Sequence, residues 1–244
     1  MLLQAEILLM AMAIGLYLYD CALLLYVNEG VVTPARGGRW LVRFGCGRVR
    51  LLGRELLVAH PLLPHRPLFR LDWRFPPKSA AAPGDWAALG AALRPLAPMV
   101  WGMALALFVL LPLGLFTRAG DPLAIAALVV LYLNLLAALA WLWLRKTDLG
   151  IPGRRLALLS FESLVCCPLG LNIVRKISLS LRVEEDLVVA ARRLQAAQDW
   201  SETCAELIAR LEEEMSDEAE DTARLAVLRM SRQQLLDGEA PCPA

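Results

Sequence analysis

Two long stretches of the chain carry no charged side chain, one from Pro98 to Phe116 and one from Pro122 to Leu144. A helix needs roughly 20 mostly apolar residues to cross the hydrocarbon core of a bilayer. Only Thr117 to Asp121 separates the two stretches. Trp101 near the start of the first and Trp143 near the end of the second match the aromatic belt of a membrane interface. The pattern predicts a tight hairpin of two transmembrane helices.

A third apolar stretch runs from Leu2 to Val27 and contains Gln4, Glu6 and Asp20. A cleaved secretory signal is the alternative reading. The stretch lacks a basic region before it, is longer than the apolar part of a signal peptide, and has no A-x-A-like cleavage site after it. We therefore expect a third, retained transmembrane helix.

A fourth apolar stretch, Leu156 to Val174, is interrupted by polar residues, proline and glycine. Basic pairs flank it, with Arg154-Arg155 before and Arg175-Lys176 after. Cations on both sides favour a segment that enters and leaves the same leaflet, because both basic pairs then reach the headgroups. We expect a re-entrant or interfacial helix; a fourth span and a buried helix of a soluble domain stay open as alternatives.

Charge is segregated along the chain although the formal net charge is only +1. Residues 28–97 hold eleven Lys or Arg against four Asp or Glu, residues 145–182 hold seven against two, and residues 183–244 hold six against fifteen. Basic loops stay on the cytoplasmic side of a membrane. We predict an N-terminus outside, with the 28–97 loop and the C-terminal tail inside. The same basic charge favours contact with anionic lipid headgroups.

Composition indicates the compartment. Only three of the 25 basic residues are lysine, in a chain rich in Ala, Leu and Arg, which is typical of GC-rich bacterial genomes. The six cysteines form no disulfide framework. We expect a bacterial inner-membrane protein.

The 28–97 loop does not have a helical pattern. Trp40 to Phe44 alternates apolar and polar residues, and glycines bound the short runs, so we expect two or three β-hairpin strands. Pro61, Pro64 and Pro67 recur at the polyproline II period, which predicts either a docking strip for a partner or a stiff connector. Residues 76–85 have the composition of a linker, and Trp86 to Leu96 that of a short amphipathic helix.

The tail from residue 183 has a helical pattern. Its apolar positions follow a 3-4 spacing, which predicts a coiled-coil-like seam for a partner helix, for a second copy, or for the basic loop of the same chain. The seam includes Leu187, Leu194, Ile208 and Leu211. After an acidic break at 215–221, a second helix is expected from residue 222 to 236.

No motif for catalysis is present: the chain lacks a phosphate-binding glycine loop, a dinucleotide fingerprint, a zinc-protease motif and a serine-hydrolase elbow. His60, His65 and Cys46 match no standard zinc spacing. We expect no catalytic residue, cofactor or metal site. Nucleic-acid binding is also not expected, because membrane topology accounts for the basic loop.

Polar residues within the apolar segments are the remaining site candidates. Asp20 and Asn134 fall at similar predicted depths and could share a hydrogen bond, either as helix–helix contact or as part of a polar pathway. A second cluster lies in or beside the fourth apolar stretch, where the alternative to a site is a kinked helix with anchoring cations. Its members are Glu162, Cys166, Asn172, Arg175 and Lys176.

The sequence therefore predicts a mainly α membrane protein. It has three transmembrane helices, one re-entrant or interfacial helix, a small β-hairpin-containing cytoplasmic loop, and a C-terminal amphipathic helical hairpin or coiled coil. The segments are 1–27, 28–97, 98–144, 145–182 and 183–244. We expect a non-catalytic scaffold or accessory subunit with a protein partner or self-association. A membrane enzyme or transport component, and a lipid-surface sensor, are the alternatives.

Overall fold

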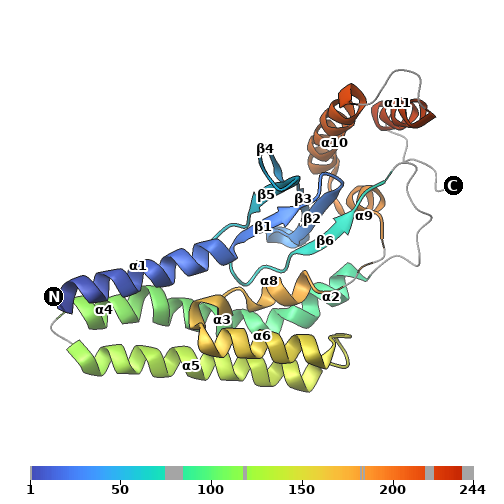
Figure 1. Ribbon diagram of the computed structural model, residues 1–244. Helices are drawn as coiled ribbons and strands as arrows, with labels where there is room; N and C mark the ends of the chain where they lie inside the picture. The colour runs from blue at the N-terminus through green and yellow to red at the C-terminus, as the bar shows by residue number, and fades with distance from the viewer. Residues whose placement is uncertain are drawn as a thin grey trace. The chain divides into compact units, whose positions relative to one another are not determined.

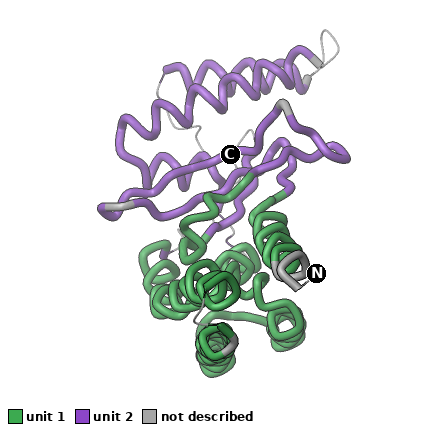
Figure 2. The backbone as a smooth tube through the Cα atoms, turned by 90° about the vertical axis from the view of Figure 1, so that its left-hand side faces the viewer, with its two compact units in different colours: residues 1–23, 58–67, 86–181 green, residues 24–57, 68–85, 182–244 purple. Residues whose placement is uncertain are grey.

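The computed structural model describes residues 2–74, 85–117, 120–181, 183, 185–217 and 223–237. The protein is mostly helical with two small sheets. It forms two compact units, each assembled from three segments of the chain (Figure 2). Unit 1 comprises residues 1–23, 58–67 and 86–181, and unit 2 comprises residues 24–57, 68–85 and 182–244. The chain therefore passes between the units several times.

Unit 1 contains two helices long and apolar enough to cross a membrane, Trp86–Phe116 and Pro122–Arg145. These include the two stretches that the sequence predicts to span (Figure 1). The first begins earlier than expected, because the predicted amphipathic helix from Trp86 continues directly into it. Its successive parts are α2 (Trp86–Leu93), η2 (Arg94–Leu96), α3 (Ala97–Leu105), the π-helical turn η3 (Ala106–Leu110) and α4 (Leu111–Phe116).

Helix α5 (Gly120–Arg145) packs along this run. Gly114 permits the close approach near the turn, since a Cβ there would lie 2.5 Å from the backbone nitrogen of Ala124. Helix α1 (Leu2–Asp20) is shorter than predicted. The apolar run after it, Ala22–Leu25, forms strand β1, because a short apolar run fits either a helix or a strand and the pairing partner decides. Whether α1 spans a membrane stays a prediction.

The fourth apolar stretch forms a helical hairpin within unit 1. Helix α6 (Gly153–Val165) runs antiparallel to α5: Trp143 Nε1 donates to Ser160 Oγ at 3.2 Å, and Tyr132 Oη donates to the carbonyl of Leu164 at 3.4 Å. The chain turns at Cys166, whose backbone leaves the helical region, and returns through two short helices. These are α7 (Cys167–Gly170) and α8 (Ile173–Ser178). The turn thus lies beside the middle of α5.

Within the described residues, six strands form two three-stranded sheets, more strands than the two or three that the sequence predicts. The additional strands are β1, β2 and β6, which are only four to six residues long. In one sheet the order is β1–β5–β4, with β4 (Cys46–Leu51) and β5 (Arg54–Val58) antiparallel. In the other the order is β3–β2–β6, with both neighbours antiparallel to β2. These strands are β2 (Glu29–Pro34), β3 (Trp40–Arg43) and β6 (Phe69–Asp72).

The tail folds onto the strands of unit 2. Helix α9 (Leu187–Leu194) begins at Asp186, whose side chain accepts from the amide of Val188 at 2.8 Å and caps the helix. Leu187 packs against Gly30 of β2, where even a Cβ would overlap the leucine. Helices α10 (Ala197–Asp217) and α11 (Ala223–Leu236) follow.

The predicted seam is not continuous, because the helix ends at Leu194 and restarts at Ala197. Leu187 and Leu211 are buried, whereas Leu194 and Ile208 are only half-buried. The buried face of α10 is rotated by about one residue from the prediction and includes polar positions. It consists of Asp199, Thr203, Leu207, Arg210 and Leu211. This face is buried within unit 2.

Candidate functional site

Unit 1 has a buried arginine at the centre of a polar cluster. Arg175 of α8 is 4% exposed and donates from one terminal nitrogen to Asn172 Oδ1 at 2.8 Å and to Cys21 Sγ at 3.2 Å. Its other terminal nitrogen donates to the carbonyls of His60 at 2.6 Å and Leu63 at 2.9 Å. A planar guanidinium suits this geometry, because it presents several donors in a rigid fork. Arg175 therefore joins α8, the end of α1 and the 58–67 segment of unit 1.

The carbonyls that Arg175 binds belong to the proline-rich segment. This segment forms consecutive turns, in which the amides of Leu63 and Arg66 each donate to the carbonyl three residues earlier. A polyproline II helix has no such bonds, so the predicted extended conformation is wrong. Pro64 and Pro67 are buried and Pro61 is half-buried. The geometry is that of a connector held inside unit 1.

Beside this cluster, Lys176 lies between two carboxylates. Its Nζ is 3.1 Å from Asp20 Oδ1 and 4.0 Å from Glu162 Oε2. The sequence-predicted cluster is thus brought together around Lys176 and Arg175, with Asp20 and Cys21 as members from α1 and the residue after it. Cys166 lies half-buried at the turn between α6 and α7. The carboxylates of Asp20 and Glu162 balance the charges of Lys176 and Arg175, so the cluster as a whole carries no net charge.

Asn134 does not bond to Asp20, so the hydrogen bond that the sequence left open between them is not formed. Its Nδ2 donates to the carbonyl of Val130 in the same helix at 2.8 Å. Its side-chain amide packs directly over Gly102 of α3, where a Cβ would lie 2.5 Å from Oδ1. Asn134 is therefore a packing residue between α3 and α5, and Gly102 provides the space for it.

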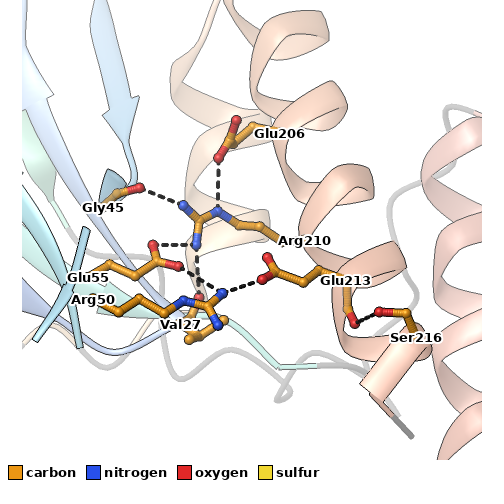
Figure 3. A network of polar contacts seen from close by, with 8 residues as sticks. All are labelled: Val27, Gly45, Arg50, Glu55, Glu206, Arg210, Glu213 and Ser216. Carbon is orange, nitrogen blue, oxygen red and sulfur yellow. Dashed lines mark hydrogen bonds and ion pairs between the residues drawn. The ribbon is translucent and has the colours of Figure 1, made fainter. Parts of the chain in front are cut away.

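Unit 2 contains a buried ion pair that the sequence does not reveal. Arg210 of α10 and Glu55 of β5 are 5% and 1% exposed, and their side chains meet at 2.8 Å (Figure 3). Arg210 also donates to the carbonyl of Gly45 at 2.8 Å and to Glu206 Oε1 at 3.0 Å. Gly45 lies so close that any Cβ would overlap Glu55. The guanidinium thus binds Glu55 of β5 and the residue that immediately precedes β4.

Further ion pairs join the same helix to the basic strands. Arg50 of β4 pairs with Glu213, and Arg39 before β3 pairs with Asp199, whose second oxygen is 3.0 Å from Arg39 Nε. The opposite net charges of the loop and the tail indicated such folding back. The sequence does not indicate which arginine is buried, because Arg210 occupies an ordinary position in a predicted helix.

Alongside these pairs is a cavity of about 630 Å³. Its strand side is formed by Leu41, Val42 and residues 44–47, and its helix side by residues of α10 with Gln195 before them. Three of the helix residues are acidic, Asp199, Glu202 and Glu206, and no basic residue lines the cavity. The cavity has an apolar floor and a negative wall, which suits a partly apolar ligand with a cation.

Among the residues that the structure describes, no nucleophile is assembled with a base and its orienting group. Within the described ranges, no group of three or more His, Cys, Asp or Glu side chains is placed to hold a metal ion. Comparison of the chain with protein-family models, with curated proteins and with solved structures yields no match. Function is therefore argued from these two sites alone.

Proposed function

We propose that this protein is a membrane-anchored scaffold or accessory subunit: unit 1 is the anchor and unit 2 carries the partner-binding surface. The observation that carries the proposal is the division of the chain itself. One unit contains both helices long and apolar enough to cross a membrane, and the other is a separately packed module with the Glu55–Arg210 pair in its interior.

Exposed apolar side chains support the anchoring role. A contiguous apolar surface larger than a few hundred Å² is unusual on a soluble monomer and indicates contact with a membrane or a protein. On α5 and α6 the exposed apolar residues recur at helical spacing and are not covered within unit 1. They include Ile125, Val129, Leu133, Leu136, Leu158, Phe161 and Val165.

The finer topology also belongs to the proposal. Helix α1 is a third span, the N-terminus is outside, and the 28–97 loop and tail are inside a bacterial inner membrane, in contact with anionic headgroups. The distribution of Lys and Arg supports this orientation. The hairpin of α6 to α8 supports a re-entrant segment, because α6 starts near the end of α5 and turns beside the middle of that helix.

The proposal is tested by purifying the protein in mild detergent from membranes of cells that express it natively. A defined protein partner is expected to co-purify in fixed proportion. The variant Arg210→Met leaves Glu55 buried without its partner, so it should lose the partner while remaining in the membrane fraction. Arg232→Met, which changes a more exposed arginine paired with Glu212, is the matched control and should retain it. A wild-type protein that runs alone as a monomer contradicts the proposal.

A membrane enzyme or transport component is the second candidate, and the Asp20–Lys176–Glu162 group favours it. Ionisable groups within a membrane often mark a substrate or ion pathway. Asp20→Ala and Glu162→Ala separate the two functions. If the purified assembly is intact but its activity is lost, the scaffold function is wrong. If assembly and activity both survive, the group has only a packing role.

A further inference from the structure

The tip of the β4–β5 hairpin is exposed and combines a strained turn with exposed apolar side chains. Leu52 and Gly53 form the two-residue turn, with φ of 53° and 75°. Turns with positive φ at both positions favour Asn-Gly, and a leucine there is strained. Leu52 is nevertheless 92% exposed, with Leu51 at 57% and Val49 at 48% beside it. The turn places an apolar group in solvent at a backbone cost, and strain of this kind is often found at binding sites.

The tip also carries positive charge. The stretch from Cys46 to Arg54 contains three arginines, the last being Arg54 itself, and no acidic residue. Arg50 is paired with Glu213. Arg54 is stacked over the exposed ring of Tyr26 at 4.5 Å and donates to its hydroxyl, without an acidic partner among the described residues. The tip therefore presents leucines next to a cation.

The acidic cavity at the other end of the same hairpin has the complementary features. The cavity touches consecutive residues, Leu41 with Val42 and then residues 44–47. Successive side chains of a strand point to opposite faces, so a cavity that touches consecutive residues lies along the backbone edge of the strands. Gly47 is exposed and has no side chain to cover that edge, whereas Gly45 is buried against Glu55. Asp199 is paired with Arg39 and Glu206 with Arg210. Glu202 makes no ion pair within the described part of the chain, although Arg39 lies near enough to interact with it electrostatically, and it is the carboxylate that an incoming cation would pair with.

We propose that the hairpin tip of one copy docks in the acidic cavity of a second copy. The leucines would cover the apolar floor formed by Leu41, Val42 and Phe44, and Arg54 would reach Glu202. A tip cannot reach the cavity of its own chain. The extended strand β4 separates Gly47 from Leu52, and five residues at about 3.3 Å each span roughly 17 Å. The contact is therefore intermolecular and head-to-tail.

This self-association goes beyond the proposed function, which concerns a different protein as partner. Anchoring in one membrane would favour it, because copies held in a bilayer with unit 2 on the same side have a raised effective concentration. Loss of self-association would leave co-purification of a different partner unchanged, so the two proposals fail separately.

The first test uses the native thiol in the cavity. Cys46 is exposed and lines the cavity, so full-length Leu52→Cys protein should form disulfide-linked dimers and longer chains when oxidised with copper-phenanthroline in liposomes. The background carries Cys204→Ser and Cys242→Ser. Adding Cys46→Ser should abolish the crosslink, and Met230→Cys on α11, also exposed, should give no Cys46-dependent product. No crosslink, or a crosslink that survives Cys46→Ser, overturns the proposal.

The second test exchanges charge between the two surfaces. Arg54→Glu chains alone and Glu202→Arg chains alone should each self-associate at least about tenfold more weakly than wild type. A mixture should associate again between unlike chains, as energy transfer between labelled chains would measure. Leu52→Asn separates binding from folding, because it suits the turn and should stabilise the hairpin while weakening association. A mixture that does not recover, or Leu52→Asn chains that associate like wild type, contradicts the proposal.

Discussion

Arg210 and Glu55 lie 155 positions apart in sequence, yet their side chains meet at 2.8 Å in the interior of unit 2. Burying two charges costs desolvation energy that the pair itself barely offsets. Additional bonds from Arg210 to Gly45 and Glu206 complete its coordination. The pair therefore contributes mainly to the specificity of docking: α10 can be buried against this hairpin only in the register that places Arg210 over Glu55.

This relationship predicts a clear asymmetry between single and double variants. Arg210→Met should lower the free energy of unfolding of unit 2 by about 3–5 kcal/mol, since Glu55 is left buried without its partner. Arg210→Met combined with Glu55→Leu should recover most of that loss. Urea titration of the full chain in detergent, followed by circular dichroism, measures both. Arg232→Met, at a more exposed ion pair, should change stability by less than about 1 kcal/mol. An equal loss in the free energy of unfolding for the single and double variants would show that the unpaired Glu55 is not the cause of the destabilisation.

The Arg175 cluster predicts that a positive charge at position 175 is not enough to hold the 58–67 segment in place. Arg175→Lys keeps the positive charge but replaces the planar fork with a single ammonium, which cannot bind Asn172 and the carbonyls of His60 and Leu63 together. We expect faster hydrogen exchange of the 58–67 segment and a loss of about 2–4 kcal/mol in unit 1. Arg155→Lys, at an exposed site on α6, is the control. If hydrogen exchange of the 58–67 segment in Arg175→Lys were as slow as in wild type, the hydrogen bonds of Arg175 would not be what holds this segment.

The close packing at Gly102 predicts a steric effect between α3 and α5. Gly102→Ala places a methyl group against the Asn134 amide and should destabilise the packing of α3 on α5 by about 1–3 kcal/mol. Gly15→Ala on α1 has no atom within 4 Å of the added Cβ, so it should be tolerated. Thermal unfolding in one detergent compares the two. Asn134→Ala in the Gly102→Ala background should restore stability, and failure to do so would exclude the steric explanation.

Asp186 predicts a pH dependence of unit 2. Burial raises the pKa of this carboxyl to about 6, although it accepts hydrogen bonds from the backbone amides of Val188 and Arg74. The folded state then holds a proton between about pH 4 and pH 6 that the unfolded chain has lost. The contribution of Asp186 to stability is therefore greatest below about pH 4 and is lost as the pH rises through 6.

The variant Asp186→Asn isolates this group. It cannot ionise, and it keeps the oxygen that accepts from Val188 but places an amide nitrogen where the other oxygen accepts from Arg74. Its stability relative to wild type should therefore be higher at pH 7 than at pH 4. Asp186→Ala also cannot ionise, but it removes the cap and should be about 1 kcal/mol less stable than Asp186→Asn at every pH. Urea unfolding at a series of pH values gives the difference. A gain from Asp186→Asn that does not vary with pH would contradict the prediction.

The α6–α8 hairpin predicts that its two ends lie on one side of the membrane. In a cysteine-depleted background, Arg155→Cys and Ser180→Cys should react with an impermeant maleimide from the same side. Thr117→Cys, at the turn between α4 and α5, should react from the opposite side. Labelling of positions 155 and 180 from opposite sides would show that residues 156–174 span the membrane.

The two long helices could be predicted because hydrophobicity is a local property. Each residue of Pro98 to Phe116 contributes to membrane affinity regardless of what it contacts, so a sum over the stretch is enough. Short segments could not be assigned in this way. Ala22–Leu25 became a strand, and the proline-rich segment became turns, because pairing and buried contacts outweigh weak local preferences.

The same distinction between local and long-range properties applies to the site residues. Asp20, Glu162, Asn172, Arg175 and Lys176 could be selected from sequence, since polar residues stand out in apolar surroundings. Their partners could not: Arg175 binds Cys21 and two carbonyls more than a hundred residues away, and Asp20 binds Lys176 instead of Asn134. Such choices depend on which segments pack together.

The sequence by itself determined the two long apolar helices, the separation of basic loop from acidic tail, and the absence of recognised catalytic motifs. Only the tertiary structure decided that the tail folds onto the loop, that Arg210 is its buried residue, and that the acidic cavity lies beside the hairpin. The physical reason is the separation along the sequence over which each property is decided. Hydrophobicity and net charge add along the chain, whereas burial of a particular side chain requires distant segments to be brought together in one register.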